Sequence, residues 1–82
     1  MYTVYILLSL KDRKRYLGST NDIIRRLEQH EKGQVISTKN RRPLKLIYSE
    51  QYDSENLARQ REKYLKTHKG YNELRNILKN II

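Results

Sequence analysis

The sequence predicts a small α+β domain in which helices pack on a three-stranded antiparallel sheet, with the elements in the order ββαβαα. Two β-rich segments, residues 2–9 and 15–20, are separated by a short polar turn, which is typical of a hairpin. A third β-rich segment covers residues 44–52. The segments between and after these strands carry apolar residues at helical spacing. The 82 residues correspond to one domain, residues 1–82.

The predicted hairpin consists of Tyr2–Ser9 and Arg15–Thr20, joined by the polar residues 11–14. Both strands are rich in aromatic, β-branched and aliphatic side chains. Gly18 interrupts the second strand, which indicates a point of unusual backbone dihedrals or of close approach by another group.

A first helix is predicted to follow the hairpin. Asn21 or Thr20 can cap it, and Asp22 is placed to complement the positive end of the helix dipole. Gly33 is a typical C-terminal stop. The apolar stripe of this helix consists of Ile23, Ile24 and Leu27.

The third predicted strand, Leu44–Tyr52, follows a basic polar loop at residues 34–43. Strict alternation places Leu44, Leu46 and Tyr48 on one face and Ile47 on the other.

Two helices complete the predicted fold. Asp53 or Ser54 caps the first of them, which is expected to run to about Thr67, where Gly70 then breaks the helical pattern. The last helix has an apolar stripe at spacings of three, four and seven, made of Leu74, Ile77, Leu78 and Ile81.

The charge balance indicates a polyanionic partner. The chain has 18 Lys and Arg against 9 Asp and Glu, a formal net charge of +9. Nucleic acid is the commonest partner of such a protein, although a basic protein without this partner has the same balance. The longest apolar run, residues 4–8, is too short for a membrane span, which takes about 20 residues, so no membrane role is expected. The absence of cysteine excludes disulfides and thiolate metal sites and suits the cytoplasm.

Five residues combine the chemical groups that a metal-assisted phosphodiester hydrolase can use. Tyr5 and Tyr16 lie on the two strands of the predicted hairpin. Arg26 and His30 are four residues apart, so they share one face of the first helix. Glu62 lies on or beside the packing face of the second helix, where a carboxylate needs a partner. Each also has a simpler interpretation: core tyrosines, a solvated arginine, a histidine at a helix end, and a carboxylate in an internal ion pair with Arg59, Arg61, Lys66 or Arg26.

These residues occur in the order and spacing of a known family. The chain resembles the GIY-YIG nuclease superfamily, and within it the small stand-alone bacterial members that are described as predicted endonucleases. The first triplet departs from the family pattern, since it lacks the leading glycine and has Val for Ile. The residues that carry the resemblance are Thr3-Val4-Tyr5, Tyr16-Leu17-Gly18, Arg26, His30 and Glu62, with segments 37–43, 46–48 and 61–66 similar to the stand-alone subgroup.

The resemblance implies a role for each site residue. Tyr5 helps to activate water and Tyr16 supplies a second hydroxyl. Arg26 stabilises the charge on the phosphorane, and His30 orients the site. Glu62 holds one Mg²⁺, with Mn²⁺ as the alternative ion.

The expected activity is a metal-dependent endonuclease that hydrolyses phosphodiester bonds in DNA, with structured, single-stranded or damaged substrates included. A non-catalytic nucleic-acid-binding module with the same fold and an RNA-directed nuclease are the alternatives. The larger enzymes of the superfamily carry additional DNA-binding segments, so a protein partner is expected to supply specificity, and DNA repair is a candidate role. We expect a monomer or a weak dimer, and Ile81 and Ile82 are compatible with either the core or a small dimer contact.

Two basic clusters are candidates for phosphate contact. The preferred one lies before the third strand, because that loop follows the helix with Arg26, and it consists of Lys39, Arg41, Arg42 and Lys45. The other lies in the hairpin turn, at residues 11–15. Tyr48 is compatible with either the site or the core. Ser19 and Thr20 are placed either to contact phosphate or to lead into the helix cap.

Overall fold

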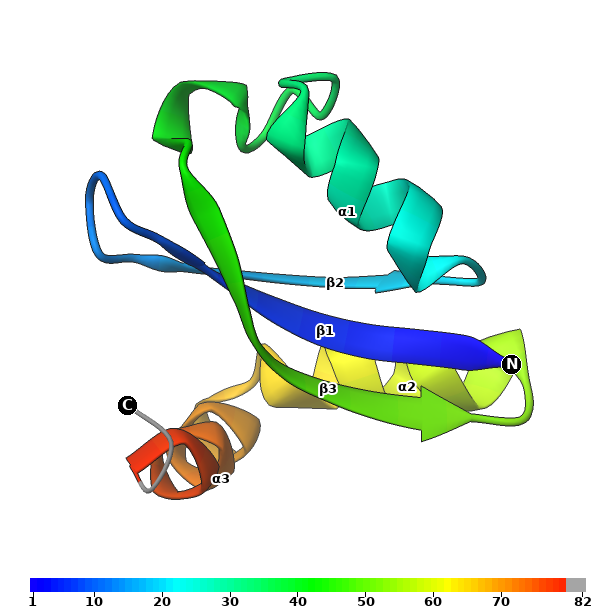
Figure 1. Ribbon diagram of the computed structural model, residues 1–82. Helices are drawn as coiled ribbons and strands as arrows, with labels where there is room; N and C mark the ends of the chain where they lie inside the picture. The colour runs from blue at the N-terminus through cyan, green and yellow to red at the C-terminus, as the bar shows by residue number, and fades with distance from the viewer. Residues whose placement is uncertain (80–82) are drawn as a thin grey trace.

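A three-stranded antiparallel sheet forms the middle layer of the protein (Figure 1). The computed structural model describes residues 1–79. The strands are β1 (Tyr2–Ser9), β2 (Arg15–Thr20) and β3 (Leu44–Tyr52), in the spatial order β2-β1-β3. All three have the predicted bounds, and the ββαβαα order is confirmed.

Helices cover both faces of the sheet. Helix α1 (Ile23–Glu31) lies over one face, while α2 (Glu55–Leu65) and α3 (His68–Lys79) lie on the other (Figure 1). A short 3-10 turn, η1 (Lys39–Arg41), lies in the loop before β3. None of the helices in residues 1–79 combines the length and apolar character needed to cross a bilayer.

The central strand β1 is buried along almost its whole length, so its side chains supply both faces of the core. Val4 and Ile6 pack toward α2 and α3, against a cluster that contains Ala58, Leu65 and Leu78. The alternate residues of β1, Tyr5 among them, lie on the α1 face. The position of the larger apolar cluster leaves the α1 face free to hold polar side chains.

The helix caps fulfil part of the sequence prediction. Gly33 lies just after α1 with φ 76°, which confirms it as the stop. The cap of α1 is Asp22, whose side chain accepts a hydrogen bond from Arg25 N at 3.1 Å, so the prediction of Asn21 or Thr20 was wrong. Ser54, one of the two predicted residues, caps α2.

Strand β3 does not alternate as predicted, because the pairing with β1 has a bulge. Ile6 pairs with Tyr48, whereas the next residue, Leu7, pairs with Leu46. Leu46 and Tyr48 therefore lie on opposite faces, and Tyr48 packs with Ile47 against the α2 and α3 core.

Gly70 does not break the helical pattern as predicted. Helix α2 ends at Leu65, two residues early, and α3 begins at His68, so Gly70 lies inside the first turn of α3. It is buried where a Cβ atom would collide with the backbone oxygen of Tyr64. Tight packing at the corner between α2 and α3 therefore explains the glycine. Of the apolar stripe of the last helix, Leu74 and Leu78 are buried. Ile81 and Ile82 lie outside the described residues.

Candidate active site

Tyr5 lies in the middle of the α1 face, where the residue opposite it has no side chain and leaves room for its ring. Tyr5 on β1 pairs with Gly18 on β2, and Tyr5 is only 1% exposed. A Cβ atom at Gly18 would lie 2.7 Å from the Tyr5 hydroxyl. The predicted close approach at this glycine is therefore confirmed, and the approaching group is the tyrosine.

The Tyr5 hydroxyl lies at the centre of a hydrogen-bonded chain. It is 2.8 Å from His30 Nε2 and accepts from Arg26 Nε at 3.4 Å. The other ring nitrogen of His30, Nδ1, lies 2.8 Å from Thr38 Oγ1. His30 and Thr38 are both buried, so this chain fixes the imidazole between a strand and the loop after α1.

Helix α1 supplies the cationic group. Arg26 and His30 lie on one face of α1, as their spacing predicted, and both reach Tyr5. The Arg26 guanidinium also donates to Gln29 Oε1 at 3.1 Å. Hydrogen bonding to the Tyr5 phenol, opposed in part by burial, raises the pKa of Arg26, which therefore stays charged. The neighbouring residue Arg25 is exposed.

Tyr16 lies beside this chain on the edge strand. Its ring centroid is 5.1 Å from that of His30 and 6.3 Å from that of Tyr5. Four of the five predicted residues thus form one cluster on the α1 face.

The electrostatics of the cluster favour a neutral phenol and a neutral imidazole. Burial raises the pKa of Tyr5, while the hydrogen bond from Arg26 acts in the opposite direction. Burial and the positive charge of Arg26 lower the pKa of His30, so its imidazole is neutral at pH 7.

Glu62 reaches the same region from the other face of the sheet. It lies on α2 and accepts hydrogen bonds from Ser19 Oγ at 2.6 Å and from Lys66 Nζ at 2.9 Å. Burial opposes its ionisation, but these hydrogen bonds outweigh burial and lower the pKa of Glu62. Burial, the charge interaction with Tyr16 and the negative charge of Glu62 all act to raise the pKa of Tyr5.

Strand β2 contributes neighbouring residues to both faces of the sheet. Gly18 and Ser19 are adjacent, so one lies on the α1 face and the other on the α2 face. Within residues 1–79 no strand pairs with the outer edge of β2, so β2 is an edge strand of the sheet.

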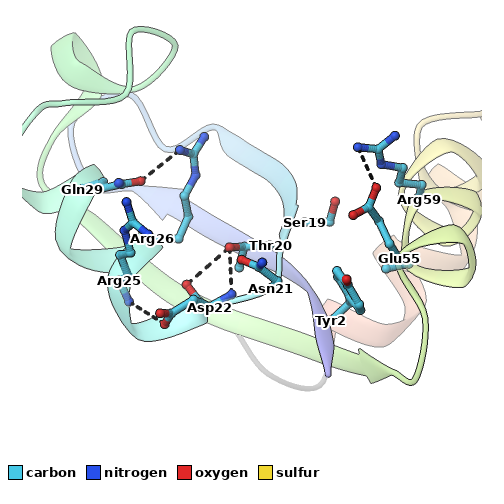
Figure 2. Close-up of a pocket in the computed structure, with 11 residues that line it drawn as sticks. Tyr2, Ser19, Thr20, Asn21, Asp22, Arg25, Arg26, Gln29, Glu55 and Arg59 are labelled. Carbon is cyan, nitrogen blue, oxygen red and sulfur yellow. Dashed lines mark hydrogen bonds and ion pairs between the residues drawn. The ribbon is translucent and has the colours of Figure 1, made fainter.

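Two hollows meet at this edge, with volumes of about 410 Å³ and 470 Å³. Ser19 and Arg59 line both of them. Figure 2 shows Arg26 on the α1 side, Arg59 on the α2 side and Ser19 between them. We call the two hollows together the edge groove.

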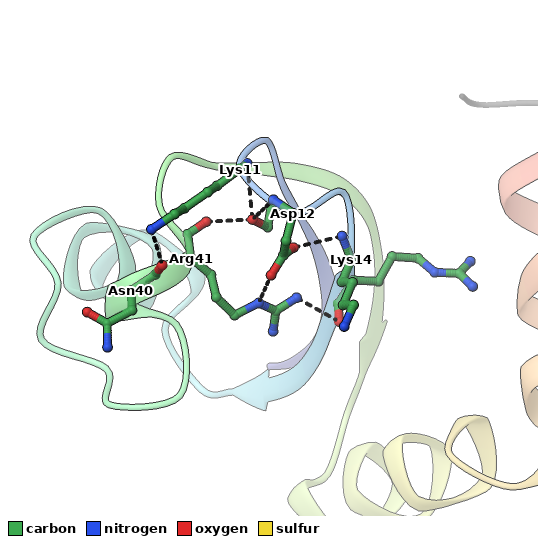
Figure 3. Close-up of polar contacts among 7 residues, drawn as sticks. Lys11, Asp12, Lys14, Asn40 and Arg41 are labelled. Carbon is green, nitrogen blue, oxygen red and sulfur yellow. Dashed lines mark hydrogen bonds and ion pairs between the residues drawn. The ribbon is translucent and has the colours of Figure 1, made fainter.

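Two of the four residues of the basic loop before β3 make contacts within the protein. Arg41 Nε donates to Asp12 Oδ2 at 3.0 Å (Figure 3). Arg42 donates to the backbone oxygens of Lys39 at 2.9 Å and Glu31 at 3.1 Å. The two guanidinium groups therefore tie the loop to the hairpin turn and to the end of α1. Lys39 and Lys45 are exposed.

Tyr48 belongs to a different cluster from the other candidate tyrosines. Its hydroxyl donates to Glu50 Oε2 at 2.6 Å, on the α2 side of the sheet. Glu50 in turn accepts from Arg61, the residue before Glu62, at 2.8 Å and 3.0 Å.

No group of three or more His, Asp or Glu residues in residues 1–79 is arranged to hold an ion. Glu62 lines the edge groove next to Ser19 and Lys66.

Three polar partners in the site were not assigned by sequence reasoning. Ser19 contacts Glu62 from 43 positions away, Thr38 contacts His30 from the loop, and Gln29 contacts Arg26. For Gln29, the spacing of three from Arg26 was an available signal. The Ser19 contact depends on how α2 packs on the sheet, which no local pattern reveals. Lys66, one of four expected ion-pair partners of Glu62, is the one that forms the pair.

The comparisons with known proteins agree with this architecture. Residues 1–75 match the family model of the GIY-YIG catalytic domain. UPF0213 proteins from Staphylococcus aureus strains Mu50 and N315 are 39% identical over 73 residues, covering 88% of this chain and 88% of each relative. The solution NMR structure of a UPF0213 protein from Bacillus halodurans has a TM-score of 0.56 and 30% identity, covering 94% of this chain and 85% of that one.

Proposed function

Because the chain belongs to the GIY-YIG family, we propose that it is a metal-dependent endonuclease that hydrolyses phosphodiester bonds in DNA. The observation that carries the proposal is the cluster of Tyr5, Arg26 and His30 on one face of the sheet, with Glu62 bound to Ser19 on the other face at the outer edge of β2. A phosphate in the edge groove lies between a fixed cation and an ionised carboxylate.

Arg26 stabilises the charge that builds up on the phosphorus oxygens. Its guanidinium is positioned by Gln29 and Tyr5 before substrate arrives, so little reorganisation is needed in the transition state. A planar guanidinium also matches the geometry of phosphate oxygens.

Tyr5 and His30 handle the proton of the attacking water. When His30 Nδ1 carries its proton and donates to Thr38, Nε2 accepts from the Tyr5 hydroxyl. The phenol can then take a proton from water while it passes its own to the neutral imidazole. This relay suits the raised pKa of Tyr5, because the phenol does not have to ionise in advance. Tyr16 packs against the His30 ring and limits its motion.

Glu62 fits the requirements of a Mg²⁺ ligand. Its carboxylate is ionised and lies on the edge groove, and Mg²⁺ is commonly held by one or two carboxylates together with waters and substrate phosphate. The ion would supply Lewis acidity that stabilises the leaving 3′ oxygen, and Mn²⁺ can replace it. Ser19 holds the carboxylate in place through its hydrogen bond.

A cleavage assay with matched acid variants tests this proposal. Wild type, E62Q and E28Q would be compared on DNA with Mg²⁺, Mn²⁺ or EDTA, after thermal melts show that each is folded. Glu28 is an exposed acid on α1, so E28Q controls for the loss of one negative charge. We expect metal-dependent cleavage by wild type and E28Q and none by E62Q. Equal cleavage by E62Q would refute the role of Glu62.

A further inference from the structure

Helix α2 carries a row of cations along the edge groove. Arg59, Lys63 and Lys66 are spaced by four and three residues, so they lie on one side of the helix. All three line the 470 Å³ hollow together with Glu62 and Ser19. Arg59 also lines the neighbouring 410 Å³ hollow, across from Arg26. We call Arg59, Lys63 and Lys66 the α2 ridge.

The charged side chains of the edge groove are more often positive than negative. Its five cations are Arg25, Arg26, Arg59, Lys63 and Lys66, and its three acids are Asp22, Glu55 and Glu62.

All three acids have local partners. Asp22 caps α1, and Glu62 is held by Ser19 and Lys66. Glu55 pairs with Arg59, but the two side chains are 53% and 73% exposed, and such surface pairs contribute little. The Arg59 guanidinium is therefore available to an anion at small cost.

We propose, building on the proposed nuclease function, that the α2 ridge is the phosphate-binding track of the enzyme. The backbone of the cleaved strand runs along the edge of β2, and Arg59 and Lys63 bind phosphates next to the scissile one. The scissile phosphate itself lies between Arg26 and Glu62.

The dimensions of α2 suit this role. Four residues of an α-helix rise about 6 Å, which is close to the step between successive phosphates of one strand. Arg59 and Lys63 can therefore contact neighbouring phosphates without bending the strand. Both are exposed, so neither has to leave a buried position to do so.

The basic loop before β3 is a weaker track. The guanidinium groups of Arg41 and Arg42 already bind Asp12 and backbone oxygens, so their use for phosphate would loosen the loop. This loop also lies at the hairpin-turn end of the sheet, beyond the C-terminal end of α1 (Figure 1).

Binding measured without cleavage tests the track separately from the nuclease activity. The affinity for a DNA duplex and for a single strand would be measured in EDTA over a range of salt concentrations. The test variant is R59A/K63A. Lys66 is left intact because its substitution would also change Glu62. The control is R75A/K79A, which removes the same two residue types at the same spacing from exposed positions on α3.

We expect the log–log salt slope of R59A/K63A to be shallower than that of wild type by about 1.8 on duplex and about 1.4 on single strand, and the slope of R75A/K79A to be unchanged. An unchanged slope for R59A/K63A, with wild type still binding, would overturn the track and leave the nuclease proposal standing. A shallower slope in K39A/K45A instead would overturn it in favour of the loop. The expected slope change in a protein that cuts nothing would support the track and count against the nuclease.

Discussion

Replacing Glu50 by Gln (E50Q) should destabilise the protein most strongly at neutral pH. Glu50 accepts two hydrogen bonds from the Arg61 guanidinium, at 2.8 Å and 3.0 Å. The hydroxyls of Tyr48 and Tyr52 donate to the same carboxylate, each at 2.6 Å. Arg61 also contacts Glu73 at 2.7 Å, so the cluster joins β3, α2 and α3.

The size of the effect follows from the pKa of Glu50. Burial opposes its ionisation, but the hydrogen bonds from Arg61, Tyr48 and Tyr52 outweigh burial and lower the pKa from 4.5 to about 2. A change of this size corresponds to at most about 3 kcal/mol of folding free energy at pH 7. Solvent reaches the cluster and screens it, so we expect about 1–2 kcal/mol, or roughly 4–16 °C in Tm for a domain of this size.

The pH dependence gives the sharper test. Because the folded-state pKa of Glu50 is lowered, its contribution is fully present above pH 4.5 and is lost as pH falls from 4.5 toward 2. The difference in unfolding free energy between wild type and E50Q should therefore shrink across this window.

Urea unfolding followed by circular dichroism at pH 7, 5 and 3 measures this difference. E55Q is the control, because the pair of Glu55 with Arg59 is exposed and its loss should cost less than about 0.5 kcal/mol. A difference between wild type and E50Q that stays constant from pH 7 to pH 3 would refute the reasoning.

Three further substitutions test the site itself. G18A places a methyl group against the Tyr5 hydroxyl, which should lower the unfolding free energy by about 1–3 kcal/mol and abolish cleavage. An unchanged Tm and cleavage rate would show that Tyr5 is not fixed there. K66M removes the cation that competes with Mg²⁺ for Glu62. The Mg²⁺ concentration needed for a given rise in Tm should therefore fall by about two- to fivefold. An unchanged Mg²⁺ dependence of Tm would argue against Glu62 as the ligand. Because the pKa of His30 is lowered in the folded state, its neutral imidazole makes wild type lose stability as pH falls below 6.5. H30Q should not show this loss when unfolding free energies are measured in urea at pH 7 and 5.5. An equal loss in both proteins would show that another group titrates.

Local patterns were enough to predict the order and bounds of the strands. Each strand is a dense run of β-branched and aromatic residues between polar turns. Gly33 follows the end of α1 because its positive φ is a local backbone requirement that glycine meets. Two errors of the fold prediction, the alternation of β3 and the role of Gly70, arose from tertiary packing. A bulge between Leu46 and Tyr48 is set by pairing with β1, and Gly70 is required by the backbone of α2 rather than by a break in α3.

Part of the geometry around the candidate site residues could also be predicted from local patterns. The shared face of Arg26 and His30 follows from helical spacing, and the structure places both at Tyr5. The Ser19 contact with Glu62 could not be predicted, because it forms across the edge of β2 between residues 43 positions apart. For the basic loop, the sequence shows the charges but not the contacts that they make. Its charges are evident in the sequence, but the binding of Arg41 to Asp12 becomes evident only when the loop and the hairpin turn are folded together.

A cleavage panel tests the central claim most directly. Purified wild type and the R26A/E62A double variant would be incubated with duplex, single-stranded and branched DNA and with RNA, in Mg²⁺, Mn²⁺ or EDTA. The account predicts that wild type cuts DNA only with a divalent ion and that the folded double variant does not. Cleavage retained by R26A/E62A, or a folded wild type that binds DNA and cuts none of these substrates with either ion, would contradict it.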